Sequence, residues 1–219
     1  MKAIVVAGGD AVPEDAAQLF GADLLIAADS GAQWLDGFGV TPNLLVGDID
    51  SIAPALLAKL EERGVVIERH ATDKDASDAE LAVERAISAG ADEVVVIGAL
   101  GGERLDHEVA NLLLLADESW PSTIRQMSIV RGATRVLVAH GGDRIELRGE
   151  AGDRVTLLPL AGDAEVVRTQ GLRYALNGEA LRFGRSRGLS NIVERVPASI
   201  SLERGTLLVI EISAGGEGR

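Results

Sequence analysis

Short apolar runs alternate with helix-forming segments through the first half of this chain, and this alternation limits the fold more than any other feature of the sequence. The runs are almost continuously apolar, which is typical of parallel strands that are covered on both faces. We expect strands at Ala3–Ala7, Leu24–Ala28, Leu44–Val46, Val65–Ile67 and Val94–Ile97. The alternation predicts a mostly parallel sheet with helices on both sides, which is a three-layer α/β domain.

Helices are expected between these runs at Pro54–Arg63, Ser77–Ala89 and Leu105–Ala116. Pro54 suits the first turn of a helix, where its missing N–H is not needed. Ser77 and Glu80 form the Ser-x-x-Glu pattern of a capping box. The apolar residues that follow Ser77 recur every three or four positions, so they fall on one face of the helix.

The second half of the chain has a different pattern, because short strand-like runs are separated by Gly- or Asp-rich turns without a long helix. This pattern is typical of an antiparallel sandwich. The expected strands are Arg135–Ala139, Arg144–Leu147, Arg154–Leu158, Ala164–Arg168, Ser199–Leu202 and Leu207–Ile212. We therefore predict an α/β domain over residues 1–122 and a β-sandwich over residues 123–219, with the boundary near Trp120-Pro121-Ser122.

The charge of the chain also divides it in two. The first 125 residues carry 23 acidic and 8 basic side chains, whereas the remaining residues carry 11 and 13, for a net charge of −13. A strongly acidic protein is a poor ligand for nucleic acid or an anionic membrane, so neither is expected as a partner. The chain has no cysteine, which excludes a zinc-thiolate site, and the absence of an apolar segment of membrane-spanning length predicts a cytoplasmic protein.

Acidic residues follow the predicted strands of the first half. Asp48 and Asp50 come directly after one strand, and two residues at this spacing in extended chain point the same way. Asp78 lies in the first turn of the next helix. Acidic residues at strand ends and helix starts are often simple turn formers, and that interpretation suits any one of them alone. For the three together we predict a magnesium site, because Mg²⁺ prefers carboxylates, waters and substrate phosphates.

Such a site would repel a polyphosphate unless cations lie nearby, and Lys74 and Arg104 are the candidates. Charge balancing among surface groups is an equally simple role for Lys74. Gly101 and Gly102 precede a predicted helix, where backbone N–H groups could approach phosphate. The chain has neither a Walker A motif nor a Gly-x-Gly-x-x-Gly motif, so ordinary P-loop and dinucleotide-binding folds are not indicated.

These acidic and glycine-rich segments, taken in order, resemble the motifs of the thiamine pyrophosphokinase family. Two segments of the second half resemble those that help to form the thiamine pocket of that family. The matching segments are 29–32, 47–51, 73–78, 101–107, 171–176 and 186–191. Two departures are Ser30, where the family often has Gly, and Tyr174, where Trp is frequent.

The resemblance implies a homodimer in which an α/β domain binds ATP and magnesium and a β-sandwich binds thiamine near the subunit interface. It implies metal or catalytic roles for Asp48, Asp50, Asp78, Arg104 and Asp106. It implies contacts with ATP for Asp29, Lys74, Asp75, Gly101 and Gly102. It implies contacts with thiamine for Ser190 and Asn191, although an ordinary turn would also explain these two residues.

The implied reaction transfers the pyrophosphoryl group of Mg-ATP to the hydroxyl of thiamine. Asp106 is a candidate general base. Two alternatives remain open: the same chemistry on another small alcohol such as a hydroxymethylpterin, and a non-catalytic module that binds a Mg-nucleotide for regulation.

Overall fold

The computed structural model describes residues 1–216, so the last three residues of the predicted second domain lie outside the described range. The chain divides into two compact units, Met1–Gly132 and Ala133–Arg219. Among residues 1–216, no helix combines the length and the apolar character that a membrane span requires.

The first unit is built on a parallel sheet whose strands lie in the order β4-β3-β2-β1-β5-β6. Its strands are β1 (Lys2–Val6), β2 (Leu24–Ala28), β3 (Leu44–Gly47), β4 (Val66–Arg69), β5 (Glu93–Ile97) and β6 (Gln126–Arg131). Its helices are η1 (Pro13–Leu19), α1 (Gly31–Gly37), α2 (Pro54–Glu62), α3 (Asp78–Ser88) and α4 (Leu105–Leu114). The chain winds outward from β1 to β4 and then returns to β5 on the other side of β1.

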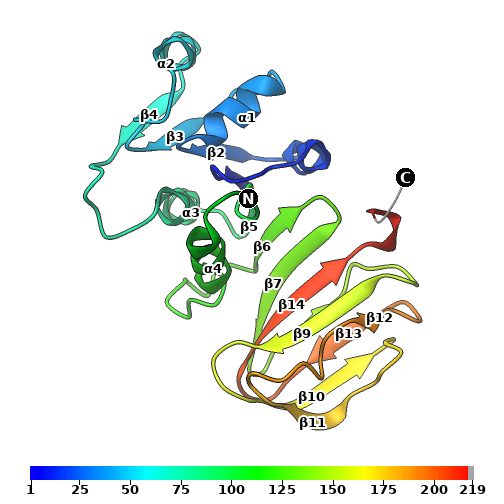
Figure 1. Ribbon diagram of the computed structural model, residues 1–219. Helices are drawn as coiled ribbons and strands as arrows, with labels where there is room; N and C mark the ends of the chain where they lie inside the picture. Colours follow the sequence, from blue (N-terminus) through cyan, green and yellow to red (C-terminus); the bar gives the residue numbers. More distant parts are fainter. Residues whose placement is uncertain (217–219) are drawn as a thin grey trace. The chain divides into compact units, whose positions relative to one another are not determined.

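Helices cover both faces of this sheet, as Figure 1 shows, with α1 and α2 on one side and α3 on the other. Alternate residues of each strand point to opposite faces. Ile4, Leu25 and Leu45 belong to a buried cluster with residues of α1 and α2. Helix α3 contacts β1, β2, β3 and β5 through a face that includes Ala82, Val83 and Ala86. The predicted three-layer α/β domain is therefore confirmed.

Local signals explain where several elements begin. Ser77 caps α3, because its side chain accepts a hydrogen bond of 3.1 Å from the backbone N–H of Glu80. Helix α1 begins at Gly31, directly against the end of β1. A Cβ atom at position 31 would lie 2.0 Å from the carbonyl oxygen of Val6, so the close approach requires glycine.

Two details of the first unit differ from the expectation. Strand β4 is not covered on both faces, since Val66 is 62% exposed. Among residues 1–216 it is an edge strand that pairs with β3 alone. Strand β6 lies after Trp120-Pro121-Ser122, yet it pairs in parallel with β5 and so belongs to the first unit.

The second unit contains two antiparallel sheets, in the orders β12-β9-β14-β7 and β11-β10-β13-β8. Its strands are β7 (Thr134–His140), β8 (Arg144–Glu146), β9 (Arg154–Pro159), β10 (Ala164–Gln170), β11 (Asn177–Leu181), β12 (Asn191–Ile192), β13 (Ser199–Ser201) and β14 (Thr206–Ile212), followed by the short helix η2 (Ala214–Gly216). One buried cluster joins Leu157 and Leu207 of the first sheet to Val167 and Ile200 of the second. The predicted antiparallel β-sandwich is confirmed (Figure 1).

Candidate active site

Carboxylates from separate loops meet at the carboxyl ends of β2 and β3. Asp29 follows β2, and Asp48 and Asp50 follow β3; one carboxylate oxygen from each lies within 4.8 Å of the others. Asp78, the first residue of α3, reaches the same place. A Cβ atom at Gly47 would lie 3.1 Å from Asp78 Oδ1 and 3.3 Å from Asp29 Cβ. The structure thus brings Asp48, Asp50 and Asp78 to one edge of the sheet, with Asp29 as a fourth carboxylate.

The backbone of two of these loops takes an unusual conformation. Ile49, between Asp48 and Asp50, has φ of 67°, and Asp29 has φ of 45°. A β-branched residue rarely adopts a positive φ. The Ile49 side chain is only 5% exposed and packs in the core of the first unit. The buried Ile49 side chain therefore anchors the turn to the core, while the carboxylates on either side of it remain at the surface.

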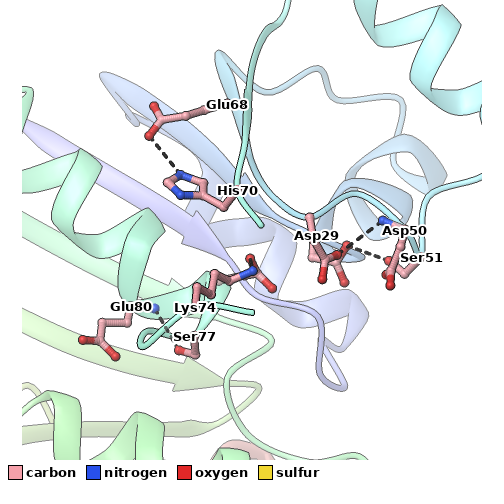
Figure 2. Close-up of polar contacts among 10 residues, drawn as sticks. Asp29, Asp50, Ser51, Glu68, His70, Lys74, Ser77 and Glu80 are labelled. Carbon is pink, nitrogen blue, oxygen red and sulfur yellow. Dashed lines mark hydrogen bonds and ion pairs between the residues drawn. The ribbon is translucent and has the colours of Figure 1, made fainter. Parts of the chain in front are cut away.

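Hydrogen bonds hold these loops in place. Ser51 Oγ donates to Asp29 Oδ1 at 2.7 Å, and the backbone N–H of Asp50 donates to Asp48 Oδ1 at 3.3 Å. Figure 2 shows Asp29, Asp50 and Ser51 gathered on one side of the view, with Lys74 reaching toward the same region. Gln33 Nε2 of α1 donates to the carbonyl oxygen of Ser51 at 3.0 Å, so the loop after β3 is fixed to α1.

Two of these carboxylates have pKa values that are shifted in opposite directions, each by a different cause. The backbone hydrogen bond from Asp50 lowers the pKa of Asp48. The charge of Asp48 raises the pKa of Asp50, with further contributions from Asp29 and Asp78. A cation placed among these four groups would therefore offset the negative charges that raise the pKa of Asp50.

Two basic side chains are paired with acidic groups at this edge. Lys74 Nζ lies 3.0 Å from Asp78 Oδ1, and the Lys74 side chain is 16% exposed. Arg104 binds Asp106 through two contacts, Nε to Oδ1 at 2.9 Å and Nη2 to Oδ2 at 2.6 Å. The hydrogen bond from Arg104 lowers the pKa of Asp106 to about 2. A carboxylate with so low a pKa is a weak base, so proton abstraction is a poor role for Asp106.

A cavity of about 250 Å³ lies beside these carboxylates. It opens where the winding of the sheet reverses, between the ends of β1 and β5, and α/β sheets bind ligands at such points. Glycine-rich loops form its floor, and the amino-terminal half of α4 forms one wall. The lining residues are Ala7, Gly8, Gly9, Ala28, Asp29, Ser30, Ser77, Asp78, Ala79, Gly98, Ala99, Gly101, Arg104, His107, Glu108 and Asn111.

Four of the predicted site residues, Asp29, Asp78, Gly101 and Arg104, line this cavity. Within the described part of the chain, the predicted residues of the first unit that do not line it are Asp48, Asp50, Lys74, Asp75, Gly102 and Asp106. Three residues of α4 were not predicted: His107, Glu108 and Asn111. Asn111 Nδ2 donates to the carbonyl oxygen of Ala99 at 2.8 Å and so ties α4 to the loop after β5. Their spacing on one helical face was the available signal.

Ser190 and Asn191 lie in the second unit. Ser190 has φ of 57°, and its backbone N–H donates to Thr156 Oγ1 at 3.0 Å. Asn191 begins β12 and is only 7% exposed, with its side-chain amide bonded to the backbone of Tyr174. Ser190 thus lies in the turn before β12, and Asn191 is the first residue of that strand.

Two family models match this chain. One, described as the catalytic domain of thiamin pyrophosphokinase, matches residues 17–125, and the other, described as its vitamin B1 binding domain, matches residues 144–207. Together they cover well over half of the sequence.

Individual relatives match most of the chain. Thiamine pyrophosphokinase of Bacillus subtilis (strain 168) is 25% identical over 213 residues, which are 96% of this chain and 98% of the relative. Thiamine pyrophosphokinase 1 of Oryza sativa subsp. japonica is 27% identical over 179 residues, or 78% of this chain and 66% of the relative. A crystal structure of the Bacillus subtilis thiamine pyrophosphokinase has a TM-score of 0.86 at 22% identity, and the match covers 97% of this chain and 99% of that one.

The two matched domains and the shared fold define a class of enzyme, the diphosphotransferases. Within that class the assignment is specific. The chain belongs to the thiamin pyrophosphokinase family.

Proposed function

We propose that this protein transfers the pyrophosphoryl group of Mg-ATP to the hydroxyl of thiamine, giving thiamine diphosphate and AMP. The observation that carries the proposal is the meeting of Asp29, Asp48, Asp50 and Asp78 beside the cavity at the β1/β5 reversal. A nucleotide in that cavity would place its phosphates next to the four carboxylates. Family membership supports thiamine as the acceptor.

The residues fit a magnesium ion. Carboxylate oxygens are hard ligands of the kind that Mg²⁺ prefers, and three of them already lie within 4.8 Å of one another. Asp48, Asp50 and Asp78 would hold the metal, with Asp29 as a fourth carboxylate of the site. When bound, Mg²⁺ would offset the charge of the triphosphate against these carboxylates.

The other residues of the site would position the nucleotide. Arg104 lines the cavity and is oriented by Asp106, so its guanidinium is available for phosphate. Gly101 and Gly102 come shortly before α4, and backbone N–H groups of this turn would approach phosphate. Lys74 and Asp75 belong to the loop before α3 and would contact ATP from that side.

The reaction needs positioning more than strong proton abstraction. The oxygen of the thiamine hydroxyl forms a bond to the β-phosphorus of ATP, the bond from that phosphorus to the α–β bridging oxygen breaks, and AMP leaves with that oxygen. The hydroxyl proton passes to solvent. The transition states of phosphoryl transfer are loose, so the alignment of the reactants and the stabilisation of charge dominate the rate. The low pKa of Asp106 agrees with a site that needs no strong base.

We further propose that the protein is a cytoplasmic homodimer with Ser190 and Asn191 in the acceptor pocket. Helix α4 supports the presence of a dimer interface. No residue of this helix is buried, although Leu105, Val109 and Leu113 form an apolar stripe along it. These three side chains are 71%, 46% and 52% exposed. An exposed stripe of this kind on a helix is typical of an interaction surface.

Incubation of the purified protein with ATP, Mg²⁺ and thiamine tests the reaction, with AMP and thiamine diphosphate measured by chromatography. We expect both products in equal amounts, and none without thiamine or in excess EDTA. A hydroxymethylpterin in place of thiamine is the control for acceptor identity. AMP release with the pterin and not with thiamine would show that the acceptor is a pterin. Nucleotide binding without turnover would show that the protein is a regulatory module and not an enzyme.

A further inference from the structure

The loop after β5 forms part of the wall of the cavity and is rich in glycine. Three of the five residues 98–102 are glycine, and Gly98, Gly101 and Gly102 have φ of 67°, 82° and 99°. Glycine adopts this left-handed conformation at little steric cost, but it loses more conformational freedom than other residues when it becomes ordered. The loop is therefore preset for a ligand only if contacts from other elements hold it.

Two hydrogen bonds hold the first part of this loop. The backbone N–H of Gly9, after β1, donates to the carbonyl oxygen of Gly98 at 2.8 Å. Asn111 of α4 donates to the carbonyl oxygen of Ala99 at 2.8 Å. Neither bond involves Gly101, so the second part of the loop is held by a different contact.

Arg131, the last residue of β6, makes that contact. A Cβ atom at Gly101 would lie 3.0 Å from Arg131 Nε and 3.1 Å from Arg131 Nη2, so the guanidinium lies directly against the Gly101 backbone. The same Nε donates to the carbonyl oxygen of Asp10 at 3.1 Å. One side chain therefore joins the loop after β1 to the loop after β5.

The backbone on both sides of Arg131 is fixed. Val130 pairs with Ile97 of β5 within the parallel sheet. The backbone N–H of Gly132 donates to the buried carboxylate of Asp15 at 2.7 Å. The guanidinium is thus carried by an ordered part of the first unit, and it can hold the glycine-rich loop in one conformation.

We propose that Arg131 is a positioning residue of the nucleotide site: it holds residues 98–102 against the loop after β1, so that the backbone N–H groups of the glycine-rich loop are in place before the triphosphate binds. The proposal rests on the proposed function for the identity of the nucleotide. Within residues 1–216 the lining of the cavity does not include Arg131, so it acts through the loop. A loop that is already ordered loses less conformational entropy on binding, which increases affinity.

Binding of Mg-ATP, measured by calorimetry, tests this role. We expect Arg131→Met to weaken binding about tenfold, which is the size expected for the loss of one net hydrogen bond. The value of kcat at saturating ATP and thiamine should fall less than about twofold, because the loop is ordered once the nucleotide is bound. A loss in kcat as large as the loss in affinity would show that Arg131 acts on the transition state, and the proposal would be wrong.

Two further variants separate position from charge. Arg131→Lys keeps the positive charge but lacks the Nε donor and the planar guanidinium, so it should bind Mg-ATP nearly as weakly as Arg131→Met. Full affinity in Arg131→Lys would show that charge alone matters, which would overturn the proposal. Arg125→Met removes the same charge from the other end of β6, where the side chain pairs with Asp92, and should leave the affinity unchanged. An equal loss of affinity in Arg125→Met would also contradict the positioning role.

Hydrogen exchange at the Gly9 amide tests the contact without any ligand. This amide is bonded to Gly98, so its exchange reports whether the two loops stay together. We expect exchange at Gly9 to be at least about tenfold faster in Arg131→Met than in the wild type. The Ala7 amide, which is bonded to Ile97 in the sheet, is the internal control and should exchange at the same rate in both.

Unchanged exchange at Gly9 would refute the positioning role even if Mg-ATP binds well. If the wild type does not bind Mg-ATP, the proposed function is wrong, whereas faster exchange at Gly9 in Arg131→Met would still support the role of Arg131 in holding the loop.

Discussion

Asp50 lies in an environment that favours a bound cation. It is exposed, yet the charges of Asp48, Asp29 and Asp78 raise its pKa, so it holds a proton more readily than a free aspartate. Its neighbour Asp48 behaves in the opposite way, because a backbone N–H donates to it. Two carboxylates separated by one residue therefore differ in affinity for protons, and a metal ion would compete with that proton at Asp50.

Asp50→Asn should reduce turnover by at least about a hundredfold, because a ligand of the proposed metal is lost while the side-chain shape is kept. Product formation at saturating ATP and a series of Mg²⁺ concentrations measures the effect. Glu62→Gln, which neutralises an exposed acidic residue at the end of α2, is the control and should retain full activity. Wild-type turnover by Asp50→Asn at high Mg²⁺ would contradict the metal assignment.

The sequence was sufficient to predict which loops carry carboxylates, but not how they meet. Asp29 was predicted as a nucleotide contact, and its approach to Asp48 and Asp50 depends on a positive φ at residue 29. A left-handed conformation at an aspartate or at a buried isoleucine such as Ile49 is imposed by tertiary packing, and no local pattern announces it. The engagement of Asn191 with Tyr174 likewise depends on contacts that are distant in sequence.

At the scale of elements, the predictions were most successful where a segment carries its own signal. The apolar runs that became β1, β2, β3 and β5 and the capped helix α3 are examples. Helix α1 has seven residues, begins and ends with glycine, and shows too little periodicity to be found. The two-residue strand β12 and the strand β6 were also missed, since each is defined by its neighbour in the sheet. The order of the strands cannot be read from their order along the chain.

Asp15 connects two elements of the first unit. It is fully buried at the start of η1, and its carboxylate accepts from the backbone N–H of Val12 at 2.9 Å and from that of Gly132, after β6, at 2.7 Å. Asp15→Ala should lower the free energy of unfolding by about 1–3 kcal/mol, because two buried N–H groups lose their acceptor. Urea denaturation measures this change. Glu14→Ala, at the exposed neighbouring position, should change it by less than about 0.5 kcal/mol.

Burial also raises the pKa of Asp15, with the hydrogen bonds from Val12 and Gly132 acting against it. A folded-state pKa above the unfolded value contributes stability that is fully present below the unfolded pKa and is lost as the pH rises through the folded pKa. Asp15→Asn lacks this titration. The difference in unfolding free energy between the wild type and Asp15→Asn should therefore shift in favour of the wild type as the pH falls toward the ordinary aspartate pKa of about 3.9. A difference that shifts the other way would contradict a raised pKa.

At the scale of the whole molecule, the two units differ in charge and construction, and each has its own core. The parallel sheet of the first unit places acidic loops at one edge, whereas the sandwich of the second unit presents exposed loops such as the one that carries Tyr174. The two family models fall on separate units, since residues 17–125 lie in the first and residues 144–207 in the second.

The proposed homodimer is tested by sedimentation equilibrium. One chain has a mass of 22.9 kDa, and we expect the wild type to sediment at about twice that mass. Val109→Asp combined with Leu113→Asp should shift the equilibrium toward monomer, because charges in the α4 stripe would have to be buried at an interface. Phe20→Asp, at a residue that is 86% exposed, is the control and should leave the mass unchanged. A wild-type protein that sediments as a monomer would remove the dimer from the proposal.

Gly31 limits which substitutions this protein can tolerate at the start of α1. Helix α1 begins where no side-chain atom fits, because even a methyl group would overlap the Val6 carbonyl oxygen. A library that randomises this codon should return only glycine among active clones. The adjacent position 30, where the chain has serine, should accept several small residues. Two residues joined by one peptide bond should therefore differ sharply in the substitutions that they tolerate.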